Sequence, residues 1–395
     1  MRVAIIGDGI IGVAIAYFLK VSGADATLIG DLSRTSPSAT DVSGGLLRVM
    51  DPDAALAHIA LRGVLTFRNW EALGLPGNPG YTACGAVYLA KATAKAHCQN
   101  IAERLDCAQY PLSFLKQKEL HRRFPGIKPP KNSTILFEPH GGYGSPKATR
   151  DALLDGYLNI GGAVVEATAQ SIEKNIITHD AGVTHADVVI VATGAWTNAL
   201  LSRSNIHCSA TTTITPRTIA IPYFEDRDGK FAKQTFPVLV DLIRGTYLRP
   251  LCGGKFLIGA GNDGHIVDST TRPALSQQHI ADAHARGAQC VPALAQAAPS
   301  GGWLGIDGYT DSNRPVVGWV TNGRNTYLAS GFSGRGYKLS LPIAAHVASE
   351  VLDRLGKRQH EITHRITTHK KAFAALVQRP ERIKDPVADT ENAEP

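Results

Sequence analysis

The sequence lacks most of the features that mark secreted, metal-binding and membrane-spanning proteins. Its six cysteines lie far apart and form no Cys-x-x-Cys pair, so we expect neither a disulfide framework nor a zinc or redox motif. GxSxG is absent, which leaves a hydrolase of this type without support. No apolar run approaches the roughly 18 residues of a membrane span. Met1 and Arg2 lead directly into an apolar run, so we expect no signal peptide and a cytoplasmic protein.

Charge of one sign is in only moderate excess. Across 395 residues, 41 Lys and Arg stand against 34 Asp and Glu, which gives a formal net charge of +7. The basic residues are scattered, so no nucleic-acid partner is expected, whereas an anionic substrate or cofactor suits the balance. The length predicts about two domains, and the sequence leaves the oligomeric state open.

The N-terminus carries a complete dinucleotide-binding pattern. An apolar run over residues 3–6 is typical of a buried parallel strand, and Gly7-x-Gly9-x-x-Gly12 follows it and opens an apolar segment with helical spacing. A second strand is expected over 26–29, so the motif lies within a βαβ unit of about 30 residues. Gly7 permits the tight turn, Gly9 lets a pyrophosphate approach the backbone, and Gly12 allows close helix–strand packing. The predicted cofactor contacts in this segment are Gly7, Gly9, Ile11 and Gly12.

One position departs from this pattern. An acidic residue normally ends the second strand and binds the ribose hydroxyls, but Gly30 stands at that position and the acid follows as Asp31. Either Asp31 reaches the ribose after a small backbone shift, or it is an ordinary loop aspartate and backbone or water holds the ribose. We keep Asp31 as a candidate ribose contact.

Three later segments favour a flavin over a nicotinamide dinucleotide. They are the polar loop over 36–48, the apolar strand that leads into Ala192-Thr193-Gly194, and the stretch SGFSGRGYKLS over 330–340. A domain that binds NAD alone needs none of them, whereas a larger flavin must be held by several returning segments.

All three segments resemble those of the glycine oxidase, sarcosine oxidase and D-amino-acid oxidase superfamily of FAD enzymes. GFSGRGYKLS is similar to the GFSGHGFK-type turn of the sarcosine oxidase branch, and DGYTDSNRPVVG over 307–318 resembles that family's segment before the last strands. The resemblance spans nearly the whole chain. The further cofactor contacts that it implies are Ser43, Gly44, Gly45, Ala169, Thr193, Gly194, Trp196, Gly331, Ser333, Gly334, Arg335, Gly336, Tyr337 and Lys338.

The resemblance also implies that the turn over 331–338 returns to the flavin ring. A helix that begins there would direct its N-terminus at the ring and stabilise the negative charge of reduced flavin. We expect Ser340 to cap that helix, with Pro342 in its first turn. The alternative is a glycine-rich surface turn with no ligand.

The predicted fold class is α/β, with two interleaved domains. A Rossmann-like FAD-binding domain of the GR2-type flavoprotein class is expected over 1–50, 140–210 and 305–360. An α+β substrate domain built on a mostly antiparallel sheet is expected over 51–139 and 211–304. The charged, proline-containing tail over 378–395 is expected to be disordered.

The resemblance implies removal of two electrons from a C–N bond, with a hydride equivalent passing to flavin N5 and an imine as product. In the sarcosine oxidase branch an Arg and a Lys clamp the substrate carboxylate, and Arg48 and Lys338 stand at the matching positions. Each has an alternative: Arg48 in a surface ion pair, and Lys338 as simple support of the turn. In the glycine oxidase branch a different Arg clamps the carboxylate. In this chain Asp307 stands at the matching position, so that clamp is missing. Asp307 either recognises a cationic group of the substrate or is a turn aspartate bonded to its own backbone.

Other positions near the predicted substrate give open alternatives. Tyr247 and Arg249 share a strand face and are candidate substrate contacts. The family's covalent flavin attachment uses a Cys near 306–309, where none stands, so we expect non-covalent FAD. The branch's oxygen-activating Lys matches Leu257, with Lys255 two residues away as a substitute or as an ordinary strand lysine.

The predicted function is therefore FAD-dependent oxidation of an amino acid or a secondary amine, with oxygen or another electron acceptor. The alternatives are a dehydrogenase with a non-oxygen acceptor, and a non-catalytic flavin-binding subunit of a larger complex. No metal site is expected.

Overall fold

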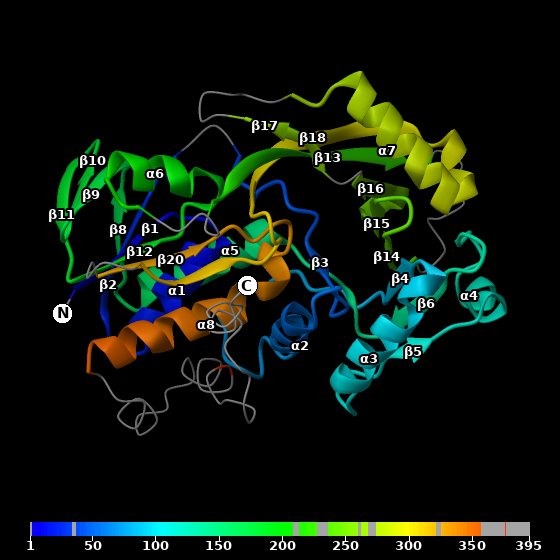
Figure 1. Cartoon of the computed structure of the whole chain (residues 1–395), viewed down its shortest axis with the longest axis horizontal. Coiled ribbons are helices and arrows are strands. Elements are labelled where there is room, and N and C mark those ends of the chain that lie inside the picture. The colour runs from blue at the N-terminus through cyan, green and yellow to red at the C-terminus, as the bar shows by residue number, and fades with distance from the viewer. Residues whose placement is uncertain are drawn as a thin grey trace, which may run out of the picture.

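The computed structural model describes residues 2–33, 37–207, 213–226, 236–259, 262–267, 274–320, 325–356 and 376. The expected disordered tail, 378–395, lies outside them. Figure 1 shows two regions side by side: a sheet with its helices around the N-terminus, and a second, larger sheet at the other end, with the long strand β13 running between them.

The first region is built on a mainly parallel sheet. Its described strands follow the order β19-β20-β12-β1-β2-β8, and every neighbouring pair is parallel except β19 with β20. Because parallel strands are covered on both faces, they are mostly apolar, as β12 is throughout and β1 is from Val3 onward. The bounds are β1 Arg2–Ile6, β2 Asp25–Gly30, β8 Ala163–Glu166, β12 Val188–Val191, β19 Val316–Trp319 and β20 Thr326–Ser330.

Alternate residues of β1 face two different layers. Val3 and Ile5 belong to the core formed with helices α1, α5 and α8, whereas Ala4 and Ile6 belong to the core under α6 and a small antiparallel sheet, β9-β10-β11. This alternation follows from the two-residue period of a strand. The bounds are α1 Ile10–Val21, α5 Pro146–Asn159, α6 Thr197–Arg203, α8 Gly336–Arg354, β9 Ala169–Glu173, β10 Ile176–His179 and β11 Gly182–His185.

The second region is built on a sheet of nine described strands. The order is β17-β13-β16-β15-β14-β4-β6-β5, with β18 paired to β13, and only β14 with β4 is parallel. The predicted α/β fold with a mostly antiparallel second sheet is thus confirmed. The bounds are β4 Ala86–Ala90, β5 Ser113–Phe114, β6 Thr134–Glu138, β13 Thr215–Glu225, β14 Val238–Asp241, β15 Thr246–Pro250, β16 Lys255–Gly259, β17 Asn262–Ile266 and β18 Ala298–Tyr309.

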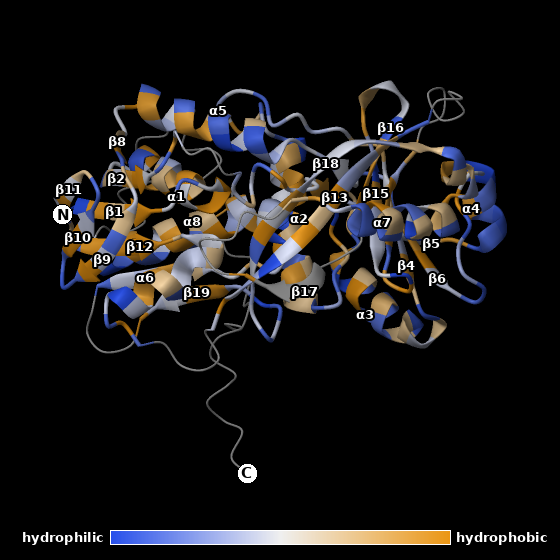
Figure 2. Ribbon diagram, turned by 90° about the horizontal axis from the view of Figure 1, so that it is seen from above, coloured by the Kyte–Doolittle hydropathy of each residue, from blue (hydrophilic) through white to orange (hydrophobic). Residues whose placement is uncertain are grey.

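The remaining elements cover this sheet or join the two regions. Figure 2 shows α5 with alternating hydrophobic and hydrophilic turns, as expected of a helix that is half buried, and α4 mostly hydrophilic at the far end of the second sheet. Among the described residues, no helix is both long and apolar enough to cross a membrane. The bounds are α2 Ala54–Arg68, α3 Lys95–Leu105, α4 Gln117–Arg123, α7 Gln277–Cys290, the paired short strands β3 Leu46–Leu47 and β7 Gly142–Tyr143, and the 3₁₀ turns η1 Ala92–Ala94, η2 Gly194–Trp196, η4 Cys252–Gly254 and η5 Pro292–Gln296.

The start of α8 differs from the sequence-based expectation. The helix begins at Gly336, four residues before Ser340, whose hydroxyl donates back to the Tyr337 carbonyl at 2.8 Å. Pro342 therefore lies inside the helix and not in its first turn. The prediction that Ser340 caps α8 was wrong, because the apolar buried residues that drive the helix begin already at Tyr337.

Helix α2 crosses α8 at a point of very close approach. A Cβ on Gly63 would lie 2.0 Å from the carbonyl oxygen of Lys338. Pro342 has no N–H to donate to that carbonyl in the helix. The Lys338 carbonyl therefore lacks the usual helical hydrogen bond from four residues on, and it faces α2. The contact places the first turn of α8 against the middle of α2.

Candidate functional site

A cavity of about 1080 Å³ runs between the two regions. Ordinary small-molecule pockets span roughly 300–1,000 Å³, so this one has room for a dinucleotide and a small substrate together. The predicted residues that line it are Gly7, Gly9, Ile11, Asp31, Ser43, Gly44, Gly45, Arg48, Ala169, Thr193, Gly194, Trp196, Tyr247, Asp307, Gly331, Gly334, Arg335, Gly336, Tyr337 and Lys338.

Three predicted residues lie behind this wall. Gly12 packs against the phosphate loop, where a Cβ would be 1.8 Å from the Gly7 carbonyl oxygen. The Ser333 backbone N–H donates to the Gly308 carbonyl at 3.0 Å, and its hydroxyl accepts from the Thr310 N–H at 3.2 Å. The guanidinium of Arg249 donates to the Gly44 carbonyl at 2.7 Å and stacks on Tyr143. Arg249 therefore supports the wall from outside, whereas Tyr247 on the same strand reaches the cavity.

The phosphate loop leaves its ligand-facing side open. Gly7 has φ +117°, and a Cβ on it would lie 2.4 Å from the Ala192 carbonyl oxygen, so only glycine fits there. A Cβ on Gly9, in contrast, would meet only the Thr40 hydroxyl, at 3.4 Å. That hydroxyl also accepts the Ile10 N–H at 3.0 Å. The start of α1 is thus free of side-chain bulk where a phosphate needs to approach the helix N-terminus.

The glycine-rich turn over 331–338 comes back to the same cavity, as the sequence predicts. Gly331, Ser333 and Gly334 have φ of +73°, +51° and +77°, so the turn runs through left-handed backbone. Asp307 ties the turn to β18: its carboxylate accepts the Gly308 N–H at 2.8 Å and the Gly334 N–H at 2.9 Å. The geometry gives Asp307 a backbone-binding role while it also lines the cavity, and burial raises its pKa.

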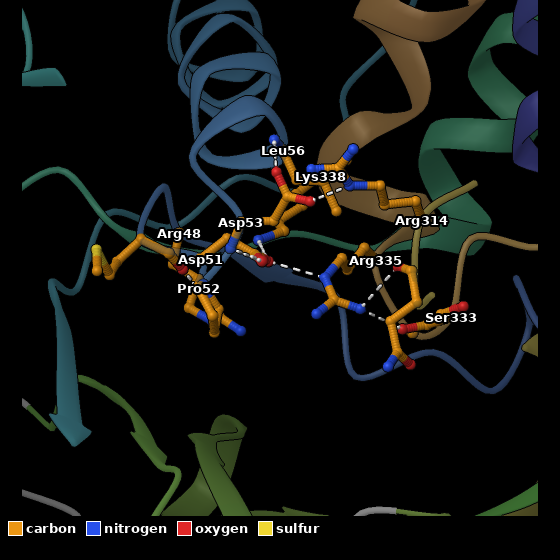
Figure 3. Close-up of polar contacts among 12 residues, drawn as sticks. Arg48, Asp51, Pro52, Asp53, Leu56, Arg314, Ser333, Arg335 and Lys338 are labelled. Carbon is orange, nitrogen blue, oxygen red and sulfur yellow. Dashed lines mark hydrogen bonds and ion pairs between the residues drawn. The ribbon is translucent and has the colours of Figure 1, made fainter. Parts of the chain in front are cut away.

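A cluster of charges forms the wall where this turn enters α8. The Asp51 carboxylate is fully buried and accepts from Arg335 Nε at 2.8 Å and from Lys338 Nζ at 2.9 Å. Figure 3 shows Asp51 with Arg335 and Lys338 beside it, next to the separate Arg314–Asp53 ion pair. Lys338 is 4 % exposed. The predicted clamp lysine is therefore already paired with an acid that sequence reasoning missed.

The pKa values of this cluster are strongly coupled. Burial by itself raises the pKa of Asp51, but the positive charges of Lys338, Arg335 and Arg48 bring it well below its ordinary value. Burial and the neighbouring Arg48 lower the pKa of Lys338 to about 8, although Asp51 opposes the shift. Asp51 is thus firmly ionised, while Lys338 is held close to its titration point.

The segment that carries Arg48 and Asp51 is fixed by a second buried acid. The Glu138 carboxylate accepts the Val49 N–H at 2.7 Å, the Met50 N–H at 2.8 Å and the Tyr110 hydroxyl at 2.6 Å. The two backbone donors fix the segment between Arg48 and Asp51. Arg48 itself donates to the Met50 carbonyl, and its guanidinium lies 5.5 Å from the centre of the Tyr88 ring.

Asp51 and Glu138 were not predicted from the sequence. Both acids bind partners that are far away in the sequence. Asp51 follows an apolar run and precedes a helix, and Glu138 is the last residue of the apolar strand TILFE. Neither position carries a signal of burial, because an acid there is also typical of a strand end or a helix cap. Asp8, which also lines the cavity, could have been singled out from the sequence, because it is an acid inside the glycine motif.

The cavity has a glycine-rich phosphate-loop motif at one end and a cluster of charges at the other, and comparison with known proteins identifies the family of the chain. Residues 2–350 match the FAD dependent oxidoreductase family. The chain belongs to that family and is an FAD-dependent oxidoreductase.

Individual relatives are distant. The chain is 23% identical to 4-methylaminobutanoate oxidase (formaldehyde-forming) of Paenarthrobacter nicotinovorans over 89% of its own length, and spans 44% of that longer protein. It is 26% identical to monomeric sarcosine oxidase of Bacillus sp. (strain B-0618), covering 67% of this chain and 70% of that one. In structure it is similar to L-proline dehydrogenase from P. horikoshii, with a TM-score of 0.77, 18% identity, and coverage of 93% and 97%. This last likeness concerns the fold.

The residues present fit FAD. Helix α1 directs its N-terminus at the open side of Gly9, η2 brings Thr193 and Gly194 to the same cavity, and the first residues of α8 line its other end. A diphosphate suits the first of these ends, and an isoalloxazine bearing negative charge when reduced suits the last. Among the described residues, no group of three or more His, Cys, Asp and Glu is arranged to hold a metal ion.

Proposed function

We propose that the protein oxidises the C–N bond of a carboxylate-bearing amino acid or secondary amine. Bound FAD would supply the oxidant by accepting at N5 the hydride equivalent from the carbon next to the nitrogen; the amine nitrogen gives up one proton, and the product is an imine. The sequence relatives support this class, since both sarcosine and 4-methylaminobutanoate are N-methyl amines that carry a carboxylate.

The charge count at the substrate end carries the proposal. Arg48, Arg335 and Lys338 bring three positive charges close to Asp51, whose single carboxylate pairs with Arg335 and Lys338. The acid of the cavity wall, Asp307, is held by the Gly308 and Gly334 N–H groups, so the cluster around Asp51 keeps an excess of positive charge. A carboxylate would balance it in a place where an uncompensated charge is costly. Lys338 has three N–H donors, of which Asp51 takes one, and the remaining donors are available to hold a substrate oxygen alongside Arg48.

The protein residues would bind and orient the substrate. Arg48 and Lys338 hold the carboxylate, and Asp51 fixes the direction of the Lys338 ammonium. Tyr247 is placed over the pocket, where a Cβ on Gly44 would lie 3.0 Å from its ring and one on Gly259 would lie 2.1 Å from it. Burial raises the pKa of Tyr247, so its hydroxyl stays protonated as a hydrogen-bond donor. No cysteine stands among the described residues of the wall, which supports non-covalent FAD.

The electron acceptor is a second question, and one observation favours a carrier over oxygen. Lys255 stands opposite Glu225 on neighbouring strands and is absent from the described lining, as is Leu257. Lys338 is thus the only lysine in the described part of the wall. We therefore keep a dehydrogenase as the second candidate, and hydrogen peroxide measured per substrate oxidised separates the two.

Anaerobic reduction of the bound flavin tests the function. Sarcosine, 4-methylaminobutanoate, other N-methyl amino acids and primary amino acids are mixed with the protein, and loss of flavin absorbance is followed. Arg48→Ala should raise KM for the reducing carboxylate substrate roughly tenfold to hundredfold, because a charge-assisted pair is lost. The matched methyl ester should show no such dependence. An unchanged KM would remove Arg48 from the clamp, and no reduction by any amine would remove the proposed function.

A further inference from the structure

The end of β2 lacks a side chain for a reason that lies in another segment. Gly30 is not among the residues with positive φ, so its backbone would accept any residue. A Cβ at Gly30 would, however, lie 2.5 Å from Asp8 Cβ and 2.9 Å from Asp8 Cγ. The side chain of Asp8 therefore occupies the space into which a side chain at position 30 would extend.

This space lies at the nucleotide end of the cavity. Strand β2 lies between β1 and β8, and the parallel strands end together there. The Gly7 N–H donates to the Ile29 carbonyl at 2.9 Å, and the Ala167 N–H donates to the Gly30 carbonyl at 3.0 Å. In such sheets a dinucleotide binds in the crevice at the carboxyl ends of the strands, and an acid at the end of the second strand holds the ribose.

The side chain of an acid in the phosphate loop is expected to point away from the diphosphate. Directed at the diphosphate, its charge would repel the ligand. Asp8 is instead 8 % exposed, lines the cavity, and lies against Gly30. Asp31, the acid next to Gly30, is half-buried and accepts the Ser33 hydroxyl at 3.2 Å.

We propose that Asp8 binds the ribose hydroxyls of the adenosine half of FAD, in place of an acid at position 30. The carboxylate has moved from the end of β2 to the phosphate loop, and Gly30 is the vacancy that lets it reach the same point. A carboxylate can accept from both vicinal hydroxyls of a ribose. This inference depends on membership of the FAD family and not on the identity of the amine substrate.

The first test measures FAD binding to the full chain. Asp8→Ala should raise the Kd, followed by quenching of flavin fluorescence, roughly tenfold to hundredfold. Asp31→Ala should raise it less, and Asp25→Ala, an exposed acid at the other end of β2, should leave it within about twofold. Melting temperatures of the FAD-free variants show whether each is folded. If Asp8→Ala does not fold, Asp8→Asn carries the same test.

A competition experiment asks whether the hydroxyls themselves are recognised. ADP should displace FAD from the wild type more strongly than 2′,3′-dideoxy-ADP does, and this preference should fall close to one in Asp8→Ala. A role limited to supporting the loop would weaken both competitors equally and leave the preference unchanged. An unchanged preference would overturn the proposal.

The most specific test moves the carboxylate back. Gly30→Glu alone should abolish FAD binding, because its side chain meets Asp8. The double variant Asp8→Gly with Gly30→Glu removes that obstacle and should restore the Kd to within about tenfold of wild type. A double variant that binds no better than Gly30→Glu, or an Asp8→Ala Kd within twofold of wild type, would show that Asp8 does not hold the ribose.

Discussion

The two ends of the cavity are built in different ways. The nucleotide end is shaped by backbone: its tight contacts involve Gly7 and Gly12, which lie on either side of the open Gly9 in one short stretch of the chain. The substrate end is shaped by charge: Asp51 meets Arg335 and Lys338, which are 284 and 287 residues away. A backbone site fails when a single carbon atom is added, whereas a charged site fails when a partner is neutralised, and this difference can be measured.

The largest effect is expected at the nucleotide end. Gly12→Ala places a Cβ 1.8 Å from the Gly7 carbonyl oxygen, and neither backbone segment can give way. We expect a loss of about 3 kcal/mol or more in the free energy of unfolding, and protein purified without bound flavin. Urea titration and flavin absorbance measure the two.

Gly318→Ala is the matched control for Gly12→Ala. No atom lies within 4 Å of a Cβ at Gly318, and its φ is not positive, so its stability should change by less than about 1 kcal/mol. If Gly12→Ala keeps its flavin and has the same free energy of unfolding as Gly318→Ala, the nucleotide end does not depend on close backbone packing.

Neutralising Asp51 should have the next largest effect. Asp51→Asn leaves Lys338 and Arg335 without their buried counter-charge, and breaking a buried pair typically costs about 3–5 kcal/mol. We expect a loss near 3 kcal/mol, the low end of that range, because Lys338 can release its proton and Arg335 is partly solvated. The same urea titration measures it.

A surface ion pair provides the comparison for Asp51. Asp282 pairs with Arg286 on α7, and more than a third of each side chain is exposed. Asp282→Asn should cost less than about 1 kcal/mol. Equal losses for the two variants would mean that the buried cluster contributes no more than an ordinary surface pair.

The smallest effect concerns pH. Because burial lowers the pKa of Lys338 to about 8, its positive charge is lost as the pH rises through 8, and KM for a carboxylate substrate should increase above that pH. Asp51→Asn should move the rise to lower pH, because the Asp51 charge favours protonated Lys338. Lys338→Arg should remove the rise, since arginine stays charged throughout. A wild-type KM that is flat between pH 7 and about 9.5 would separate Lys338 from the clamp.

The titration of Lys338 should affect the stability of the fold in the opposite direction. The folded chain binds the Lys338 proton less tightly than the unfolded chain does, because its pKa is lowered on folding. The contribution of Lys338 to stability therefore rises with pH between about 8 and its ordinary value of 10.5. Activity and stability should thus respond to alkaline pH in opposite directions.

Local patterns predicted much of the fold. The expected strand over 26–29 lies within β2. The pair Ser145-Pro146 is typical of a helix start, and in the structure the Ser145 hydroxyl caps α5, with Pro146 as the first helical residue. The local pattern over 164–169 predicts one further strand, but the structure has two, β8 and the start of β9, because the chain leaves the parallel sheet after Glu166 to form the small antiparallel one. The domain boundaries remain predictions, although α2 packs on α8 of the first region.

The sequence by itself determined the dinucleotide cradle, because its glycines and its helix act within a few residues of one another. It also determined which cations and tyrosines would be candidates for the substrate end. Only the tertiary structure decided how those charges are paired: that Asp51 takes Lys338, that Glu138 holds the Arg48 segment, and that Asp8 fills the space beside Gly30. Electrostatic and steric contacts depend on distance in space, and separation along the chain does not reveal that distance.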